Sequence, residues 1–215
     1  MKNLLSILIT VLIFSSAVLH AQGRNAGKLK QTEISFMGGY LFNSSYDGYN
    51  GSVDLKDSPN YGATISYRPN KASTMTIELE YLGSQVDVEL RPYQLTVLDT
   101  IETVKVSGNY FLVGVGYGSM VSPKTQLFSM FKLGMIYAVP SSSSRYSSAT
   151  NFAVSLAAGA KFYLSKSFGI RLQTGIYFPV RFSEGGMYVG TGGVGYGASS
   201  SIMQFNLSGG ILFAF

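Results

Sequence analysis

The chain has 215 residues, of which 46% are hydrophobic and only 13% are charged, and its formal net charge is +5. The charged share is half of what is usual in soluble domains, and the chain has 25 glycines but neither Cys nor Trp. This composition excludes a disordered chain, a disulfide-stapled fold and a thiolate metal site.

The first predicted element is a secretory signal peptide over residues 1–21. Lys2 makes the start positive, an apolar stretch covers residues 4–19, and Ala21 is a small residue suited to cleavage before Gln22. The alternative is a membrane anchor, but the apolar stretch is shorter than the ~20 residues that a spanning helix needs. We therefore expect the mature chain to begin at Gln22.

Cleavage at that point removes His20, the only histidine of the chain. The mature chain then has no His, Cys or Trp. Residues 22–32 include three basic and no acidic side chains before Glu33, and we expect them to form a periplasmic N-terminal tail. A single barrel domain is expected over residues 33–215.

Eight strands are predicted in the mature chain from alternation of apolar and small or polar residues with a period of two. In one of them Met75, Ile77, Leu79 and Tyr81 alternate with Thr and Glu. The eight strands are expected at residues 33–42, 60–68, 74–82, 109–118, 127–137, 151–163, 169–179 and 202–215.

The connections between these strands alternate between long and short, which is typical of outer-membrane barrels with tight periplasmic turns and long external loops. The short turns are residues 69–73, 119–126 and 164–168. The long connections, expected outside the cell, are residues 43–59, 83–108, 138–150 and 180–201.

Each predicted strand has one bulky apolar face and one small or polar face. An eight-stranded barrel has an interior only just wide enough for side chains, so the small face is expected inside. The apolar face then requires lipid, because such a large apolar surface is not tolerated in water. The sequence therefore predicts an all-β fold, an eight-stranded antiparallel transmembrane up-and-down β-barrel.

Aromatic residues fall near the strand ends on the apolar face, as expected for girdles at the two membrane–water interfaces. The outer girdle would consist of Phe42, Tyr61, Tyr81, Tyr137, Phe152 and Phe178. The inner girdle would consist of Tyr67, Tyr117, Phe162, Phe213 and Phe215.

Two segments carry a resemblance to a known family: the hairpin-like stretch AAGAKFYLSKSFGIRLQTGIYFPV at residues 157–180 and the final stretch FNLSGGILFAF. They resemble the small outer membrane protein β-barrel families common in Bacteroidota, of the PorT, OmpX and OmpA-barrel type. The resemblance implies a multi-pass barrel in the Gram-negative cell outer membrane, surrounded by its lipid and inserted by the barrel assembly machinery. The implied C-terminal assembly signal is Leu207, Gly209, Ile211, Phe213 and Phe215.

Five charged residues lie on the face predicted to point into the barrel: Glu78, Glu80, Lys132, Lys161 and Arg171. Buried charges must be paired or hydrated. We expect Glu78 and Glu80 to pair with the three basic residues in a salt-bridged plug that fills the lumen. The alternative is a narrow, gated path for ions or protons lined by the same groups.

No catalytic residue, cofactor or metal site is predicted. The barrel enzymes that share this architecture resemble one another in using a histidine, and the mature chain has none. The GxGxxG spacing at residues 190–195 does not indicate a dinucleotide site, because no strand–helix unit is predicted around it, and we expect a mobile surface loop there.

The connection 83–108 continues the alternation of its flanking strands, which predicts a protruding hairpin that turns around Arg91 and Pro92. An exposed strand edge there could bind a protein or surface partner. The triplet at residues 99–101 also resembles an O-glycosylation site.

We therefore expect a non-enzymatic protein with a structural or surface-interaction role through its external loops. The alternatives are a porin-like pore for ions or small solutes, or a PorT-like accessory role in protein secretion. The basic residues are scattered along the chain, so no nucleic-acid partner is expected. The sequence leaves the oligomeric state open.

Overall fold

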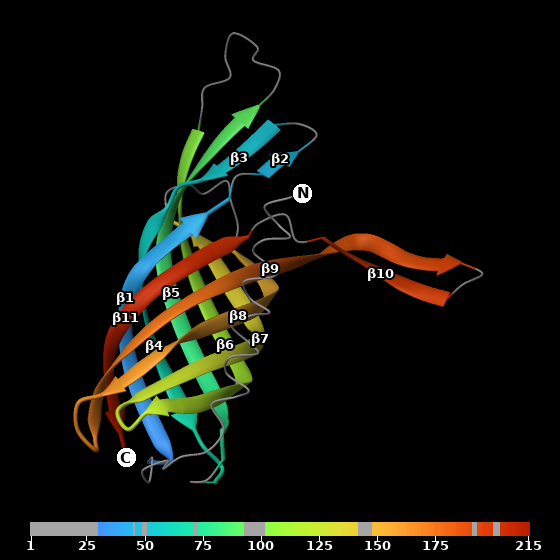
Figure 1. Ribbon diagram of the computed structural model, residues 1–215. Helices are drawn as coiled ribbons and strands as arrows, with labels where there is room; N and C mark the ends of the chain where they lie inside the picture. Colours follow the sequence, from blue (N-terminus) through green and yellow to red (C-terminus); the bar gives the residue numbers. More distant parts are fainter. Residues whose placement is uncertain are drawn as a thin grey trace, which may run out of the picture.

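The computed structural model of the protein describes residues 30–44, 46–48, 51–70, 73–92, 102–141, 148–190, 193–199 and 203–215. Eight antiparallel strands close into a barrel, which confirms the predicted fold (Figure 1). In order around the ring they are β1 (Thr32–Asn43), β4 (Ser58–Tyr67), β5 (Met75–Pro92), β6 (Glu102–Ser122), β7 (Thr125–Pro140), β8 (Ala149–Tyr163), β9 (Phe168–Gly190) and β11 (Gln204–Ala214).

The ring is closed by pairing between the first and last strands, from Glu33 opposite Ala214 to Asn43 opposite Gln204. The register shifts along the strands around the ring. If each residue is followed to its direct partner on the next strand, a path that starts at Glu33 on β1 comes back to β1 at Asn43, ten residues farther along. This stagger means that the strands are tilted against the barrel axis. No helix among the described residues is long and apolar enough to cross a membrane.

Three further strands lie in connections that we predicted to be loops. β2 (Tyr46–Gly48) and β3 (Gly51–Leu55) occupy part of the connection 43–59, and β10 (Gly193–Ser199) pairs with the far end of β9 in the connection 180–201. The prediction of a loop at residues 190–195 was therefore wrong at its two ends, which are strand. In β10, Val194 and Tyr196 alternate with glycines, so the period of two was present there but was interpreted as a glycine-rich loop.

The predicted hairpin above the membrane is present. β5 and β6 stay paired up to Leu90 opposite Glu102, beyond the last β6–β7 pair at Val106 and Pro140. The turn does not lie at Arg91 and Pro92, as predicted, because both residues still pair with β3. β3 also occupies the edge of β5 that we expected to be open. We call β2, β3 and the paired segments 86–92 and 102–106 the outer platform (Figure 1).

The two faces of the barrel wall differ as predicted. Bulky apolar side chains such as Leu79 and Phe131 point outward, with exposed fractions of 54% and 44%. The neighbouring residues Glu78, Glu80 and Lys132 point inward and are buried. The bulky face is therefore the one that requires lipid.

Inward-facing glycines allow neighbouring strands of this narrow barrel to approach each other closely. A Cβ atom added at Gly114 on β6 would lie 2.0 Å from the carbonyl oxygen of Phe131 on β7. In the reverse direction, a Cβ added at Gly134 would lie 2.0 Å from the carbonyl oxygen of Phe111. Both distances are far shorter than a van der Waals contact, so only glycine fits where these two strands approach each other.

Candidate functional site

The centre of the lumen is filled by an ion-pair cluster of Glu78, Glu80, Lys132 and Arg171. Arg171 donates two hydrogen bonds to Glu78, with both nitrogen–oxygen distances at 2.8 Å. Lys132 lies 2.7 Å from Glu78 and 2.5 Å from Glu80. All four side chains are buried, so the structure brings together four of the five charged residues that the sequence predicted to face the lumen.

The fifth predicted residue, Lys161, has a different partner. Its Nζ atom lies 2.5 Å from Oε2 of Glu33, which the sequence analysis left out of the lumen set. Glu33 also accepts a hydrogen bond of 2.7 Å from the Tyr163 hydroxyl and lies 3.3 Å from Arg68. A second ion-pair cluster of Glu33, Arg68 and Lys161 thus forms at the end of the barrel where the short turns lie, which we call the inner end. Glu33 occupies an inward-facing position in the alternation of its strand, and this could have predicted its place in the second cluster.

An aromatic ring lies between the two clusters. The Arg171 guanidinium carbon is 4.5 Å from the centroid of the Phe128 ring, and Lys161 Nζ is 5.3 Å from it. Attraction between a cation and an aromatic face is worth about 2 kcal/mol when the pair is desolvated. Phe128 therefore connects the two clusters and fills space that charged groups alone would leave.

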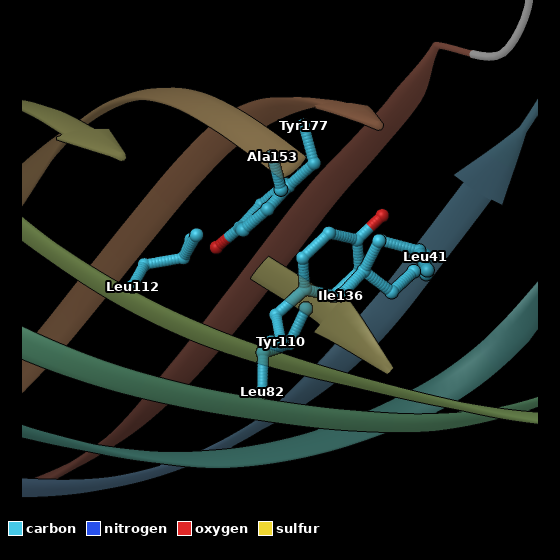
Figure 2. Packing of buried hydrophobic residues seen from close by; sticks show 7 residues of the cluster. All are labelled: Leu41, Leu82, Tyr110, Leu112, Ile136, Ala153 and Tyr177. Carbon is cyan, nitrogen blue, oxygen red and sulfur yellow. The ribbon is translucent and has the colours of Figure 1, made fainter. Parts of the chain in front are cut away.

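A cluster of buried apolar and aromatic side chains covers the ion pairs toward the outer end of the barrel, where the long connections lie. Figure 2 shows its members: Leu41, Leu82, Tyr110, Leu112, Ile136, Ala153 and Tyr177. Tyr177 donates a 2.9 Å hydrogen bond to Glu80, and Tyr110 donates one to Gln204. These side chains come from β1, β5, β6, β7, β8 and β9 and lie in the lumen above the charges. We call this set the apolar cover.

The outer platform has its own charged contacts. Asp54 on β3 and Glu89 on β5 are directly opposite each other, and Lys56 lies 2.8 Å from Asp54 and 3.2 Å from Glu89. Hydrogen bonds to Asp54 and then to Glu89 raise the pKa of Lys56. Asp87 and Lys105 form a second, exposed pair of facing residues on β5 and β6. The platform therefore presents charged groups above the barrel wall.

The other predicted site residues have the following places. Leu207, Ile211 and Phe215 of the predicted assembly signal point outward and are exposed, and Gly209 and Phe213 are half-buried. The cleavage site at Ala21 and Gln22 and the triplet 99–101 lie outside the described residues. Within the described ranges, no group of three or more His, Cys, Asp or Glu side chains could hold a metal ion.

Comparisons with known proteins place this geometry in a family. The family model described as "Outer membrane protein beta-barrel domain" matches residues 6–177. The crystal structure of Neisserial surface protein A (NspA) is similar over 86% of this chain and 97% of its own, with a TM-score of 0.56 and 12% sequence identity. The outer membrane protein OprG from Pseudomonas aeruginosa is similar over 87% and 97%, with a TM-score of 0.56 and 14% identity.

At these identities the two structures show the fold alone, and no curated protein matches the chain significantly. The family match covers most of the chain and agrees with the closed ring, the apolar outer face and the polar lumen. The chain therefore belongs to the outer membrane protein beta-barrel domain family and resides in the cell outer membrane.

Proposed function

We propose that the protein is a non-enzymatic surface-interaction protein that contacts its partner through the outer platform. The observation that carries this proposal is the continuation of β5 and β6 beyond the barrel wall, where β3 pairs with β5 and β2 pairs with β3 as an extension of the same sheet. A barrel that served only to span the membrane would not need strands of this length. Surface loops positioned by a rigid scaffold are the usual place for binding in such proteins.

The state of the lumen supports the same proposal. Glu78 and Glu80 are paired with Lys132 and Arg171 in the centre of the lumen, and the apolar cover lies above them. Such a filled interior gives the barrel a rigid base for its outer platform.

The test is cross-linking on living cells through a photoreactive side chain at position 87. Asp87 is exposed on the platform, and Phe131, which faces lipid, provides the control position. We expect a discrete protein or glycan adduct at position 87 and only lipid adducts at position 131. Equal labelling at the two positions would contradict a partner on the platform.

A narrow pore is the second candidate, favoured by the charged lumen residues Glu78, Glu80 and Lys132. It requires the apolar cover to open. Steady single-channel openings of the wild-type protein in planar bilayers would favour the pore, and electrically silent bilayers favour the interaction role.

The narrower resemblance to the PorT type leads to a third possibility, an accessory role in protein secretion. Comparison of the secreted proteins of cells with and without this protein tests it. A changed set of secreted proteins would move the proposal from surface contact to secretion.

A further inference from the structure

Acidic and basic residues are distributed unequally along the chain. Of the eleven acidic residues, Glu33, Glu78 and Glu80 lie in the lumen, and the other eight fall in the connections 43–59, 83–108 and 180–201 at the outer end. The short turns and residues 22–32 contain six basic residues and no acidic one: Arg24, Lys28, Lys30, Lys71, Lys124 and Lys166. Among the described residues, the tail and the short turns therefore carry only positive charge, at Lys30, Lys124 and Lys166.

Three of these lysines lie close together in the described structure. Lys30 Nζ donates a hydrogen bond of 3.3 Å to the Ser167 hydroxyl, next to Lys166 in the β8–β9 turn. The β6–β7 turn reaches the same place, because the Tyr163 amide donates a 2.7 Å hydrogen bond to the carbonyl oxygen of Lys124. We call Lys30, Lys124 and Lys166 the basic rim. Among the described residues, none of the three makes an ion pair with a carboxylate.

The basic rim lies directly beside lipid-facing apolar residues. Phe162 lies near the end of β8 and Leu164 directly after it, and they are 37% and 58% exposed. Phe215 at the end of the barrel wall is 63% exposed. Phe162 and Phe215 are members of the inner aromatic girdle that the sequence predicted. Lysines next to such a belt can extend their amino groups to the headgroup level while their methylene chains remain on apolar surface.

We propose that the basic rim binds the phosphate groups of anionic phospholipids in the periplasmic leaflet of the outer membrane. The positive charge of the rim is complementary to the lipid phosphate, and the adjoining aromatic residues contact the acyl chains of the same lipid. The attraction between a lysine and an anionic membrane surface falls off within a Debye length. The rim therefore selects anionic over zwitterionic lipids and holds the barrel at a fixed depth.

The test measures lipid selectivity of the full chain in proteoliposomes by electron spin resonance with spin-labelled phospholipids. The probes are spin-labelled phosphatidylglycerol and phosphatidylcholine in a phosphatidylcholine host. The test variant is Lys124→Gln with Lys166→Gln, and both lysines are exposed, so folding is not at risk. The matched control is Lys56→Gln with Lys105→Gln, which removes the same number of charges from the outer end of the barrel.

The wild-type protein is expected to associate more strongly with phosphatidylglycerol at about 0.05 M salt and to lose this preference at about 0.5 M. The test variant should lower the ratio of the two association constants by about fivefold or more, and the control should leave it unchanged. A wild-type ratio of one, or a ratio that survives both rim substitutions, would overturn the proposal. If the rim instead bound an acidic protein or polymer, the wild-type ratio would be one.

Discussion

Arg171 and Glu78 form a two-pronged ion pair across the lumen, from β9 to β5, with both nitrogen–oxygen distances at 2.8 Å. The guanidinium presents two parallel donors to the two carboxylate oxygens, which adds directional specificity to the charge attraction. Lys132 contacts the same carboxylate at 2.7 Å. Glu78 is therefore the anion on which two buried cations depend.

Replacing Glu78 by Gln should strongly destabilise the barrel, because it leaves Arg171 and Lys132 buried without a shared anion. Breaking a buried pair by removing one partner typically costs about 3–5 kcal/mol of unfolding free energy. Urea unfolding in detergent micelles measures this loss. Glu89→Gln, a substitution of the same kind on the outer part of β5, should cost no more than about 1 kcal/mol.

The variant in which both Glu78 and Glu80 are replaced by Gln should unfold at a still lower temperature. Lys132 then loses both of its carboxylate partners. An unchanged melting temperature of this double variant would show that the ion pairs do not stabilise the folded barrel.

Phe128→Leu should lower the unfolding free energy by about 2 kcal/mol through loss of its contacts with Arg171 and Lys161. Leucine retains an apolar side chain of similar size but has no aromatic face for the cations. Phe131→Leu on the same strand is the control, since that ring points into lipid. Equal effects of the two substitutions would mean that the cation–ring contacts add nothing.

The ring strands and their two faces could be predicted because lipid and lumen make opposite demands on alternate residues. The pairing of Glu78 and Glu80 with basic residues could be expected because both carboxylates occupy inward-facing positions, where a buried charge needs a partner. The role of Glu33 was missed because a charge at the very start of a strand is equally compatible with an exposed end. Phe128 was missed because a large ring fits inside a narrow barrel only when the residue opposite it on the next strand is small.

That small residue is Gly159 on the neighbouring strand β8. A Cβ added at Gly159 would lie 2.7 Å from the Phe128 ring. Such a match between two residues 31 positions apart depends on strand register, which local sequence patterns do not contain. The strands β2, β3 and β10 were missed because their pairing partners lie beyond the ends of the predicted wall strands.

Gly114→Ala should lower the unfolding free energy by about 1–3 kcal/mol, because the added Cβ would overlap the Phe131 carbonyl oxygen and force the strands apart. Gly108→Ala on the same strand and the same face is the control. Its Cβ would have ordinary contacts at 3.6 Å from Ser84 and 3.8 Å from Ile136. The difference in migration between boiled and unboiled samples measures the folded fraction of each variant, and equal fractions would refute the steric argument.

Replacing both Tyr110 and Tyr177 by Ala should increase ion conductance, because it removes two rings from the apolar cover. Planar bilayer recordings should show openings that are absent or rarer in the wild-type protein. The control replaces Tyr61 and Tyr67, two outward-facing tyrosines, by Ala. If the lumen variant and the control conduct equally, the rings do not close the lumen.

Lys56→Met should loosen β3 from β5, because Asp54 and Glu89 would lose the amino group that contacts both carboxylates. The folded-state pKa of Lys56 is raised, so its contribution is fully present below the unfolded pKa, near 10.5, and is lost as pH rises through the folded pKa. The chain has no cysteine, so a single nitroxide label at position 87 can report strand mobility. The label should be mobile in the variant at pH 7, and in the wild-type protein only at strongly alkaline pH.

Lys124→Met at the opposite end of the barrel is the control for this measurement. It should leave the label at position 87 immobile at neutral pH. A label that is equally mobile in the wild-type protein and the Lys56 variant at pH 7 would show that Lys56 does not hold the platform together.

The contact between the two ends of the described chain has a consequence for biogenesis. The Phe215 amide donates a 2.8 Å hydrogen bond to the Thr32 carbonyl, and β11 completes the pairing of both β1 and β9. A polypeptide that stops before β11 leaves two unsatisfied edges, which hydrocarbon does not tolerate. Stable insertion of the barrel therefore requires β11 to be present.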